Sequence, residues 1–412
     1  MPVLEAAPTR LLDDLRSARA ESDRLFSVLK PEALYQRPIA ERHRAIFYLG
    51  HLDGFDSIQI CREGLGLKSS EPELDKLFQA GIDPDAGHLP ADAATDWPTR
   101  ERVEAYVKHC REWVDRHVER APEEIVHMAL EHREMHLETL AYMFHNFSHD
   151  LKFAPPKLEP MSTGASEHLE WREIPAGEAI LGKPHDSSFG WDNEYEETRR
   201  KVPAFRMQRF PVTNGEYLEF VKQGAAIPHF WTQSGKDFFY RGMFEDLSLP
   251  LDWPVYVTQR EAEAYAQWLG KDLATEEEFH RAAFGTPSGE NRDYPWETPA
   301  RNAETLEGLG NFDFKRWVPE SVHATPAGDS AFGVSQLVGN GWEWTRTPFG
   351  PFPGFAARAS YPGYSANFFD GEHYVLKGGS SRTAARLLRR SFRNWFRRDY
   401  PYMYAKFRCV ER

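Results

Sequence analysis

The chain has 412 residues, a length typical of two or three domains, and 41% hydrophobic and 27% charged residues, as in ordinary globular proteins. Its formal net charge of -13 argues against a general nucleic-acid binder, although the arginine-rich stretch 386–400 leaves a local basic patch possible. No stretch approaches 18 consecutive apolar residues and the N-terminus has no apolar signal segment, so we expect no membrane partner and a cytoplasmic location.

The first 150 residues predict helices. Apolar residues recur at helical spacing in the segments 10–29, 42–66, 99–120 and 122–150. Helices of this length pack as an antiparallel bundle. We therefore predict a four-helix bundle domain over residues 1–152, in which the long segment 67–98 connects the second helix to the third.

The composition changes after this domain. Proline, serine and glycine predict a linker over 153–168. Residues 169–412 are rich in Gly, Pro, Trp and Phe, which predicts short strands and long loops, interrupted by helical segments at 258–270 and 274–284. The fold class is therefore α+β. The three cysteines lie far apart without a CxxC pair, which argues against a disulfide framework and against a cysteine-based zinc site.

The fourth predicted helix carries a candidate metal site. His132 and His136 are four residues apart, so both lie on one helix face. A zinc peptidase would have glutamate directly after the first histidine, and Arg133 stands there instead. His51, in the otherwise apolar segment 47–55, is the best candidate for a third ligand. Three imidazoles suit zinc or non-haem iron, and spacing does not choose between them. The alternative is that each histidine is an ordinary hydrogen-bonded residue.

Five motifs in the second half carry a resemblance to a known family. They are "FPVTNGEYLEFV" (210–221), "WPVYVTQREAEAYAQWLGKDLATEEEFHRAA" (253–283), "QLVGNGWEWTRTPF" (336–349), "VLKGGSS" (375–381) and "SFRNWFRR…YAKFRCVE" (391–411). Together they resemble the formylglycine-generating-enzyme-like sulfatase-modifying domain, which implies a C-type-lectin-like fold. With a histidine-bearing bundle before it, nearly the whole chain resembles the ergothioneine-biosynthesis sulfoxide synthase family, and the bundle resembles the DinB type.

The resemblance implies an enzymatic activity and a cofactor. Members of the family bind Fe(II) through three histidines, which match His51, His132 and His136 here. They use O2 as co-substrate to join a sulfur or selenium donor to the imidazole of hercynine, which is Nα-trimethylhistidine. The expected partners are therefore small molecules, namely hercynine and a selenosugar or thiol donor. The oligomeric state stays open.

The resemblance also implies residues for substrate binding and catalysis. Asn394, Trp395 and Phe396 match the family motif near the betaine, and aromatic faces suit its quaternary ammonium. Core packing is the alternative for Trp395. A tyrosine near the iron is expected to donate a proton. Tyr364 is favoured over Tyr361 for this role, and packing within a loop is the alternative for both.

The segment 77–100 departs from the thiol-using members, which carry arginines or tyrosines there. It has no tyrosine, and no arginine before Arg100. Its aspartates suit a polyhydroxy ligand, with a solvated loop as the alternative; they are Asp83, Asp85, Asp92 and Asp96. Met135 stands where ergothioneine synthases often have glutamine, and we expect it to contact the substrate.

These departures resemble the selenoneine synthase branch, which joins a selenosugar to hercynine. One alternative is an ergothioneine sulfoxide synthase that uses γ-glutamylcysteine, cysteine or another thiol. An alternative of another class is a non-catalytic lectin-like binding protein, in which zinc bolts the bundle together.

Overall fold

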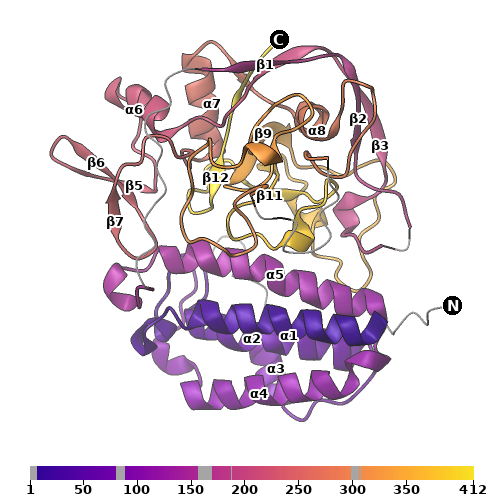
Figure 1. Ribbon diagram of the computed structural model, residues 1–412. Coiled ribbons are helices and arrows are strands. Elements are labelled where there is room, and N and C mark those ends of the chain that lie inside the picture. Colours follow the sequence, from indigo (N-terminus) through magenta and orange to yellow (C-terminus); the bar gives the residue numbers. More distant parts are fainter. Residues whose placement is uncertain (1–6, 80–88, 156–168, 187, 298–305, 307) are drawn as a thin grey trace. The chain divides into compact units, whose positions relative to one another are not determined.

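Helices form the N-terminal part of the chain, and strands, loops and shorter helices form the C-terminal part (Figure 1). The computed structural model describes residues 7–79, 89–155, 169–186, 188–297, 306 and 308–412. The chain divides into two compact units, Met1–Lys157 and Leu158–Arg412. The predicted mixture of helix and sheet is confirmed. Most of the predicted linker, residues 156–168, lies outside the described residues.

The four predicted helices of the N-terminal unit are present, with a fifth that was not predicted. They are α1 (Ala7–Phe26), α2 (Ala45–Ser57), α3 (Pro72–Phe78), α4 (Arg100–His117) and α5 (Glu123–His145). The helix α2 continues as the π-helical stretch Ile58–Glu63. The prediction missed α3 because it is short. Its signals are Pro72 in the first turn and the acidic Glu73 beside it.

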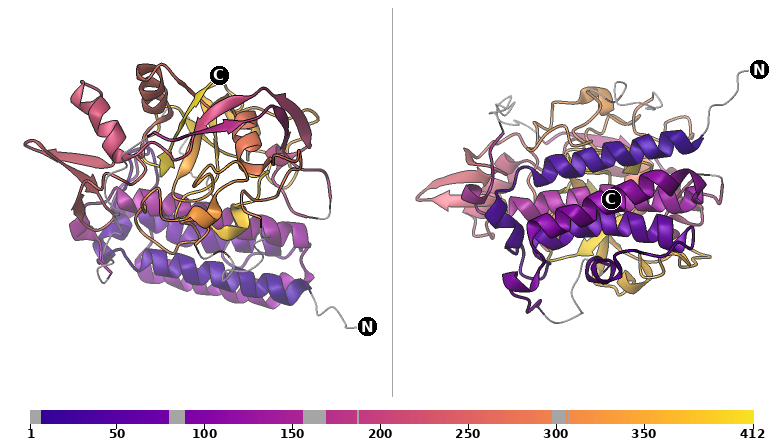
Figure 2. Two further views of the ribbon diagram at one scale, coloured as in Figure 1. Left: turned by 45° about the horizontal axis from the view of Figure 1, so that its top comes forward. Right: turned by 90° about the horizontal axis from the view of Figure 1, so that it is seen from below.

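Small residues let the helices of this unit approach closely. The helix α2 packs against α3, α4 and α5, and α1 packs against α5; the views of Figure 2 show the long helices running side by side. A Cβ atom at Gly50 would lie only 2.5 Å from the ring of Phe78, and one at Gly54 would lie 2.9 Å from Oη of Tyr106. Glycine at these two positions therefore permits the packing of α3 and α4 on α2.

Two four-stranded sheets organise the C-terminal unit. The first has the order β1 (Trp171–Ile174), β4 (Phe205–Gln208), β13 (Cys409–Glu411) and β8 (Asp272–Leu273). The second has the order β11 (Asn394–Arg397), β10 (His373–Lys377), β9 (Trp342–Pro348) and β12 (Ala405–Lys406). Smaller sheets are formed by β2 (Gly177–Leu181) with β3 (Thr198–Val202), and by β5 (Trp231–Ser234), β6 (Asp237–Arg241) and β7 (Asp246–Ser248).

Three helices of this unit begin with the same local signal. They are α6 (Asn214–Lys222), α7 (Gln259–Trp268) and α8 (Glu276–Phe284). Each is preceded by a Thr-x-x-Glu capping box, in which the threonine hydroxyl accepts from the backbone N–H of the glutamate. The helices α7 and α8 fall in the predicted helical segments 258–270 and 274–284, whereas α6 was not predicted. None of the helices in the described ranges is both long and apolar enough to span a bilayer.

Candidate metal centre and aromatic cluster

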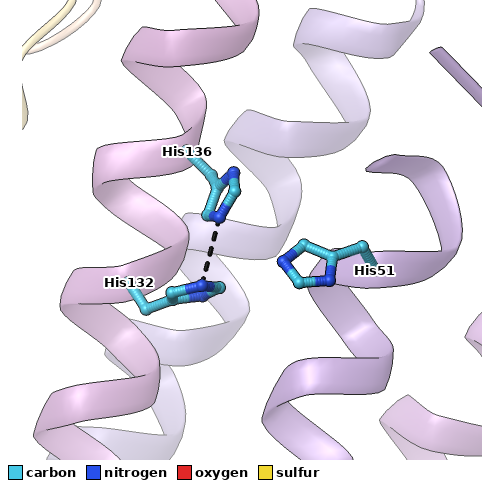
Figure 3. A group of neighbouring side chains, drawn as sticks. All are labelled: His51, His132 and His136. Atoms are coloured by element: carbon cyan, nitrogen blue, oxygen red, sulfur yellow. Dashed lines mark hydrogen bonds between the residues drawn. The ribbon is translucent and has the colours of Figure 1, made fainter. Parts of the chain in front are cut away.

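The structure brings the three predicted metal ligands together (Figure 3). His51 lies on α2, and His132 and His136 lie one turn apart on α5. One nitrogen from each ring lies within 4.8 Å of the others, and no other such group of His, Cys, Asp or Glu occurs within the residues that the structure describes. The Nε2 atoms of His132 and His136 are 3.1 Å apart. The ring centroid of His51 lies 5.4 Å from that of His132 and 5.0 Å from that of His136.

A backbone carbonyl orients the His51 ring. Nδ1 of His51 lies 2.6 Å from the carbonyl oxygen of Phe78, at the end of α3. A carbonyl only accepts, so Nδ1 carries the proton and the lone pair is on Nε2. Nε2 has no hydrogen-bond partner among the described residues. The ring also stacks on Phe47, with centroids 5.0 Å apart. This arrangement fixes the tautomer that binds a metal through Nε2.

Burial keeps all three imidazoles neutral. It lowers the pKa of His51 to about 4 and holds the pKa values of His132 and His136 well below the usual range. Repulsion among the rings adds to the effect for His132 and His136. Phe55 stacks on His132 with centroids 3.5 Å apart, which adds to the dry surroundings. Neutral imidazole is the form that coordinates a metal.

The donor set fits a metal with open coordination positions. Structural zinc sites normally close with four protein ligands, whereas catalytic sites keep a position open. The group formed here by described residues has three members. It therefore disfavours the alternative of a structural zinc bolt. Three imidazoles suit a first-row divalent metal and do not by themselves choose iron over zinc.

A cluster of aromatic side chains lies in the C-terminal unit. This aromatic cluster consists of Trp191, Phe349, Tyr361, Tyr364, Phe368 and Trp395. Trp395, on β11, stacks on Phe349 with centroids 4.2 Å apart and planes 6° from parallel. The ring of Tyr364 is nearly perpendicular to that of Trp395, with centroids 5.3 Å apart, and it stacks on Trp191 at 3.9 Å. The predicted residues Tyr361, Tyr364 and Trp395 thus come together, since the two tyrosine rings lie 6.0 Å apart.

The remaining residues of the "RNWF" motif do not join this cluster in the same way. Successive side chains on a strand point to opposite faces, so Asn394 and Phe396 face away from the side of β11 on which Trp395 lies. Oδ1 of Asn394 accepts from the backbone N–H of Trp395 at 2.9 Å. Phe396 stacks on Tyr400, with centroids 4.9 Å apart. The expected role of Asn394 and Phe396 near the betaine stays a prediction.

A buried ion pair contacts the aromatic cluster at Phe349. Both Arg393 and Glu276 are buried, and the guanidinium donates to the two carboxylate oxygens at 2.9 and 3.0 Å. The guanidinium also lies 4.9 Å from the ring centroid of Phe349 and 4.2 Å from that of Phe352. In the sequence, Arg393 stands out only as part of the basic stretch 386–400. No local signal links it to Glu276, which is far away in the chain.

Other arginines of the stretch 386–400 are also paired. Arg389 donates to both carboxylate oxygens of Glu194, and Arg398 donates to Glu263. These ion pairs neutralise much of the charge that the sequence concentrates there. Several arginines of this stretch therefore join distant segments of the C-terminal unit through ion pairs, which leaves less positive charge for a basic surface.

The segment 77–100 differs from expectation where the structure describes it. Asp83 and Asp85 lie outside the described residues. Asp92 accepts from Arg37 at 2.5 Å, Arg44 at 2.8 Å and Trp97 Nε1 at 2.8 Å. Burial alone would raise the pKa of Asp92, but these hydrogen bonds outweigh it and lower the value to about 2. The segment therefore has guanidinium neighbours, although they come from elsewhere in the chain.

Two further residues singled out from the sequence, Asp96 and Met135, lie in a short turn and on α5. Asp96 accepts from the backbone N–H of Ala93 at 2.7 Å, as the cap of a short turn. Met135 lies on α5, partly exposed and directly before His136. At about 100° per residue, its side chain leaves the helix beside the face that carries the histidines.

The sequence of the chain is similar to one protein-family model and to several known proteins. Residues 162–412 match the family described as the sulfatase-modifying factor enzyme 1-like domain. The chain is 31% identical to a protein named hercynine oxygenase from Mycolicibacterium smegmatis, over 95% of each chain. It is 29% identical to ergothioneine biosynthesis protein 1 of Neurospora crassa, over 98% of this chain and 58% of that protein. It is 39% identical to a hercynine oxygenase of Mycobacterium tuberculosis, over 53% of this chain.

The chain thus spans little more than half the length of two of these relatives, 58% of the Neurospora protein and 54% of the Mycobacterium tuberculosis protein. The match to the Mycolicibacterium protein covers both halves described above, the helical unit with the three histidines and the unit with the aromatic cluster. The chain belongs to the hercynine oxygenase family and carries a sulfatase-modifying factor enzyme 1-like domain.

Proposed function

We propose that the protein is an O2-dependent enzyme that forms a carbon–chalcogen bond on the imidazole of hercynine, with Fe(II) held by His51, His132 and His136. The observation that carries the proposal is the group of three buried, neutral imidazoles whose candidate ligand atoms lie within 4.8 Å of one another. The similarity to hercynine oxygenases over 95% of the chain supports the substrate.

The reaction is a balanced four-electron oxidation. Hercynine loses a C–H bond, the donor loses its S–H or Se–H bond, and a carbon–chalcogen bond forms. One oxygen atom of O2 is left on the chalcogen and the other leaves as water. Iron, when bound, supplies the activation of O2. The chain contributes three nitrogen ligands, the carbonyl of Phe78 that orients His51, and a dry environment formed by aromatic side chains such as Phe47 and Phe55.

The aromatic cluster is the proposed site for the betaine end of hercynine. A quaternary ammonium has no N–H to donate, so aromatic faces are its natural partners, at about 0.5–2 kcal/mol for each good contact. Trp395 and Tyr364 are both half-buried, and each stacks on a neighbouring ring, Phe349 or Trp191, so the proposed contact uses the remaining face. A phenol beside them is a suitable proton donor. Burial raises the pKa of Tyr361, which keeps that phenol protonated.

We propose further that the chalcogen donor is a selenosugar. A donor with free carboxylates would need guanidinium groups to bind it. Arg37 and Arg44 are the guanidinium neighbours of the segment 77–100, but both already pair with Asp92. Asp92 thus partly neutralises these two guanidinium groups, which favours a donor without carboxylates. The runner-up is an ergothioneine sulfoxide synthase that takes γ-glutamylcysteine, cysteine or another thiol.

The test is a donor comparison. The full chain is loaded anaerobically with Fe(II) and mixed with hercynine and O2, with either a selenosugar or γ-glutamylcysteine. Oxygen uptake and the mass of the imidazole product are measured, with metal-free protein as the control. Product from the selenosugar supports the full proposal. Product from the thiol peptide alone overturns the selenosugar assignment. No uptake and no new product with any donor overturns the enzyme itself.

A further inference from the structure

An ionic cluster, buried except at Arg111, lies next to the three histidines within the N-terminal unit. It consists of Arg19, Asp53, Asp56, Arg111 and Arg133. Arg133 directly follows His132 on α5, and its side chain is fully buried. Asp53 and Asp56 lie on α2, the helix that carries His51, and their side chains are 3% and 0% exposed. Asp53, Asp56 and Arg133 therefore place charges of this cluster on both helices that carry the candidate ligands.

One guanidinium joins these two helices. Nη2 of Arg133 donates to Oδ1 of Asp53 and to Oδ2 of Asp56, both at 2.7 Å, and Nε donates to Oδ2 of Asp56 at 3.2 Å. Nη1 donates to Oγ of Ser22 on α1 at 3.0 Å. The guanidinium is planar and its donors have fixed directions, so these bonds restrict the rotation and sliding of α5 against α2.

The other arginines of the cluster act on different helices. Arg111, on α4, donates to the two oxygens of Asp53 at 3.1 and 3.0 Å, and it also pairs with Asp23 on α1 at 2.7 Å. Arg19, on α1, lies 3.7 Å from Asp53. These residues link Asp53 to α4 and α1, whereas Arg133 links it to α5. The chain thus offers a matched comparison of two arginines that share one carboxylate.

We infer that Arg133 is a positioning residue for the metal centre: its ion pairs with Asp53 and Asp56 set the register of α5 against α2. In this register, His132 and His136 stay within ligand reach of His51. The inference rests on the proposed function, because it presumes that these histidines bind a metal.

The direction of these contacts matters more for the metal centre than their strength. Apolar residues of similar volume often replace a buried ion pair without loss of stability, so the pair is weak evidence for stability alone. A directional polar contact in a packed core, in contrast, can specify one register among several that apolar packing allows. A rotation or slip of α5 would move His132 and His136 together and leave His51 behind. The expected consequence of losing Arg133 is therefore a distorted ligand set on a folded bundle.

The test uses Co(II), whose visible spectrum reports ligand geometry. The full chain is titrated anaerobically with Co(II) as wild type, Arg133→Met and Arg111→Met, and thermal unfolding of each is recorded. We expect Arg111→Met to keep the wild-type spectrum and an affinity within about threefold. We expect Arg133→Met to bind about 10–100-fold more weakly, the range found when outer contacts of a metal site are lost, with a changed spectrum. Arg133→Lys should recover part of the affinity, because it keeps the charge without the fork.

Two results would overturn the inference. One is wild-type Co(II) affinity and spectrum in Arg133→Met. The other is an equal loss of affinity in Arg111→Met, which would make the effect one of general stability. Should Arg133→Met fail to fold, Asp56→Asn takes its place: weaker binding with a changed spectrum supports the inference, and unchanged binding overturns it. Failure of the wild-type chain to bind Co(II) would instead overturn the proposed function, and the positioning role with it.

Discussion

Nδ1 of His51 lies 2.6 Å from the carbonyl oxygen of Phe78, so a backbone atom at the end of α3 orients a candidate metal ligand on α2. The contact leaves Nε2 of His51 directed towards the Nε2 atoms of His132 and His136 (Figure 3). The three rings are held in place by helix packing within the N-terminal unit. Outer contacts of this kind orient the histidine ligands of metalloproteins. The protein itself therefore sets the positions of the three rings.

Removal of one imidazole should abolish metal binding. We expect His136→Ala to lose Fe(II) and oxygen uptake, because two ligands cannot retain the ion. The C-terminal unit should stay folded, because it has a hydrophobic core of its own. Elemental analysis and near-UV circular dichroism measure the two effects. The control is His109→Ala, on α4, where the ring hydrogen-bonds to the surface residue Ser70 and stacks on Trp113, away from the three histidines. Full activity in His136→Ala would contradict the ligand assignment.

Acid should destabilise the metal-free protein. Burial lowers the pKa of His51 from its usual 6.5 to about 4, so between these values the unfolded chain binds a proton that the folded chain does not. The stability contributed by the neutral imidazole is complete above pH 6.5 and is lost as the pH falls towards 4. The expected slope is about 1.4 kcal/mol per pH unit for each such histidine. Urea unfolding at pH 5, 6 and 7.5 measures it.

The matched control for this pH effect is His51→Phe, which removes one titrating group from the same site. Its stability should depend less steeply on pH than that of the wild type. Equal slopes for the two proteins would show that His51 is not buried in its neutral form.

The aromatic cluster should govern the affinity for hercynine. We expect Trp395→Ala to weaken binding about 5–30-fold, which corresponds to about 1–2 kcal/mol of lost cation–π contact. Trp395→Phe should retain most of the affinity, because a smaller aromatic face remains. Calorimetric titration with hercynine measures both. Trp268→Ala is the control, since Trp268 is 38% exposed on α7. Equal affinity in wild type and Trp395→Ala would remove Trp395 from the betaine site.

A proton donor can be separated from a packing residue by deleting only its hydroxyl. We expect Tyr364→Phe to lower kcat about 10²–10⁴-fold, while the KM for hercynine stays near the wild-type value because the ring still stacks on Trp191. Tyr361→Phe should have a much smaller effect. The reverse pattern would transfer the role to Tyr361. Wild-type kcat in both variants would exclude a catalytic phenol in this pair.

The ion pair beneath the aromatic cluster should matter for stability. Arg393→Met leaves the buried carboxylate of Glu276 without its partner, which costs about 3–5 kcal/mol. Arg199→Met, which breaks exposed pairs with Glu178 and Glu197, should cost less than about 1 kcal/mol. Denaturant unfolding followed by tryptophan fluorescence compares the two variants. Similar losses would mean that Arg393 is less buried than the structure has it.

Much of the helical unit could be predicted from the sequence, because helical spacing and the i, i+4 pair of histidines are local patterns. His51 was found because a histidine in the middle of an apolar segment needs a partner. The carbonyl of Phe78 could not be found in this way, since backbone atoms leave no trace in residue type. Arg133 was noticed only as the residue that breaks a peptidase motif. Its contacts with Asp53 depend on how two helices pack.

The C-terminal unit shows the same division. The motifs that gave the resemblance also contain Trp395 and the capping boxes of α7 and α8. Trp191 belongs to the aromatic cluster, yet it lies outside those motifs and reaches Tyr364 only through the fold. The sequence predicts that Asp92 binds a polyhydroxy ligand or lies in a solvated loop, because nothing local indicates its ion pairs with Arg37 and Arg44. Charge pairing between distant segments was the main feature that the sequence did not reveal.

The contact between His51 and Phe78 has a consequence for mutational tolerance. The group that orients the ring belongs to the peptide backbone, so no substitution at position 78 deletes it. The sensitive position is Gly50, where a Cβ atom would lie 2.5 Å from the ring of Phe78 and would push α3 away from α2. A scan of single substitutions should therefore find Gly50 intolerant and position 78 permissive towards other large apolar residues. The geometry of the metal site would then depend on Gly50, a residue that has no side chain.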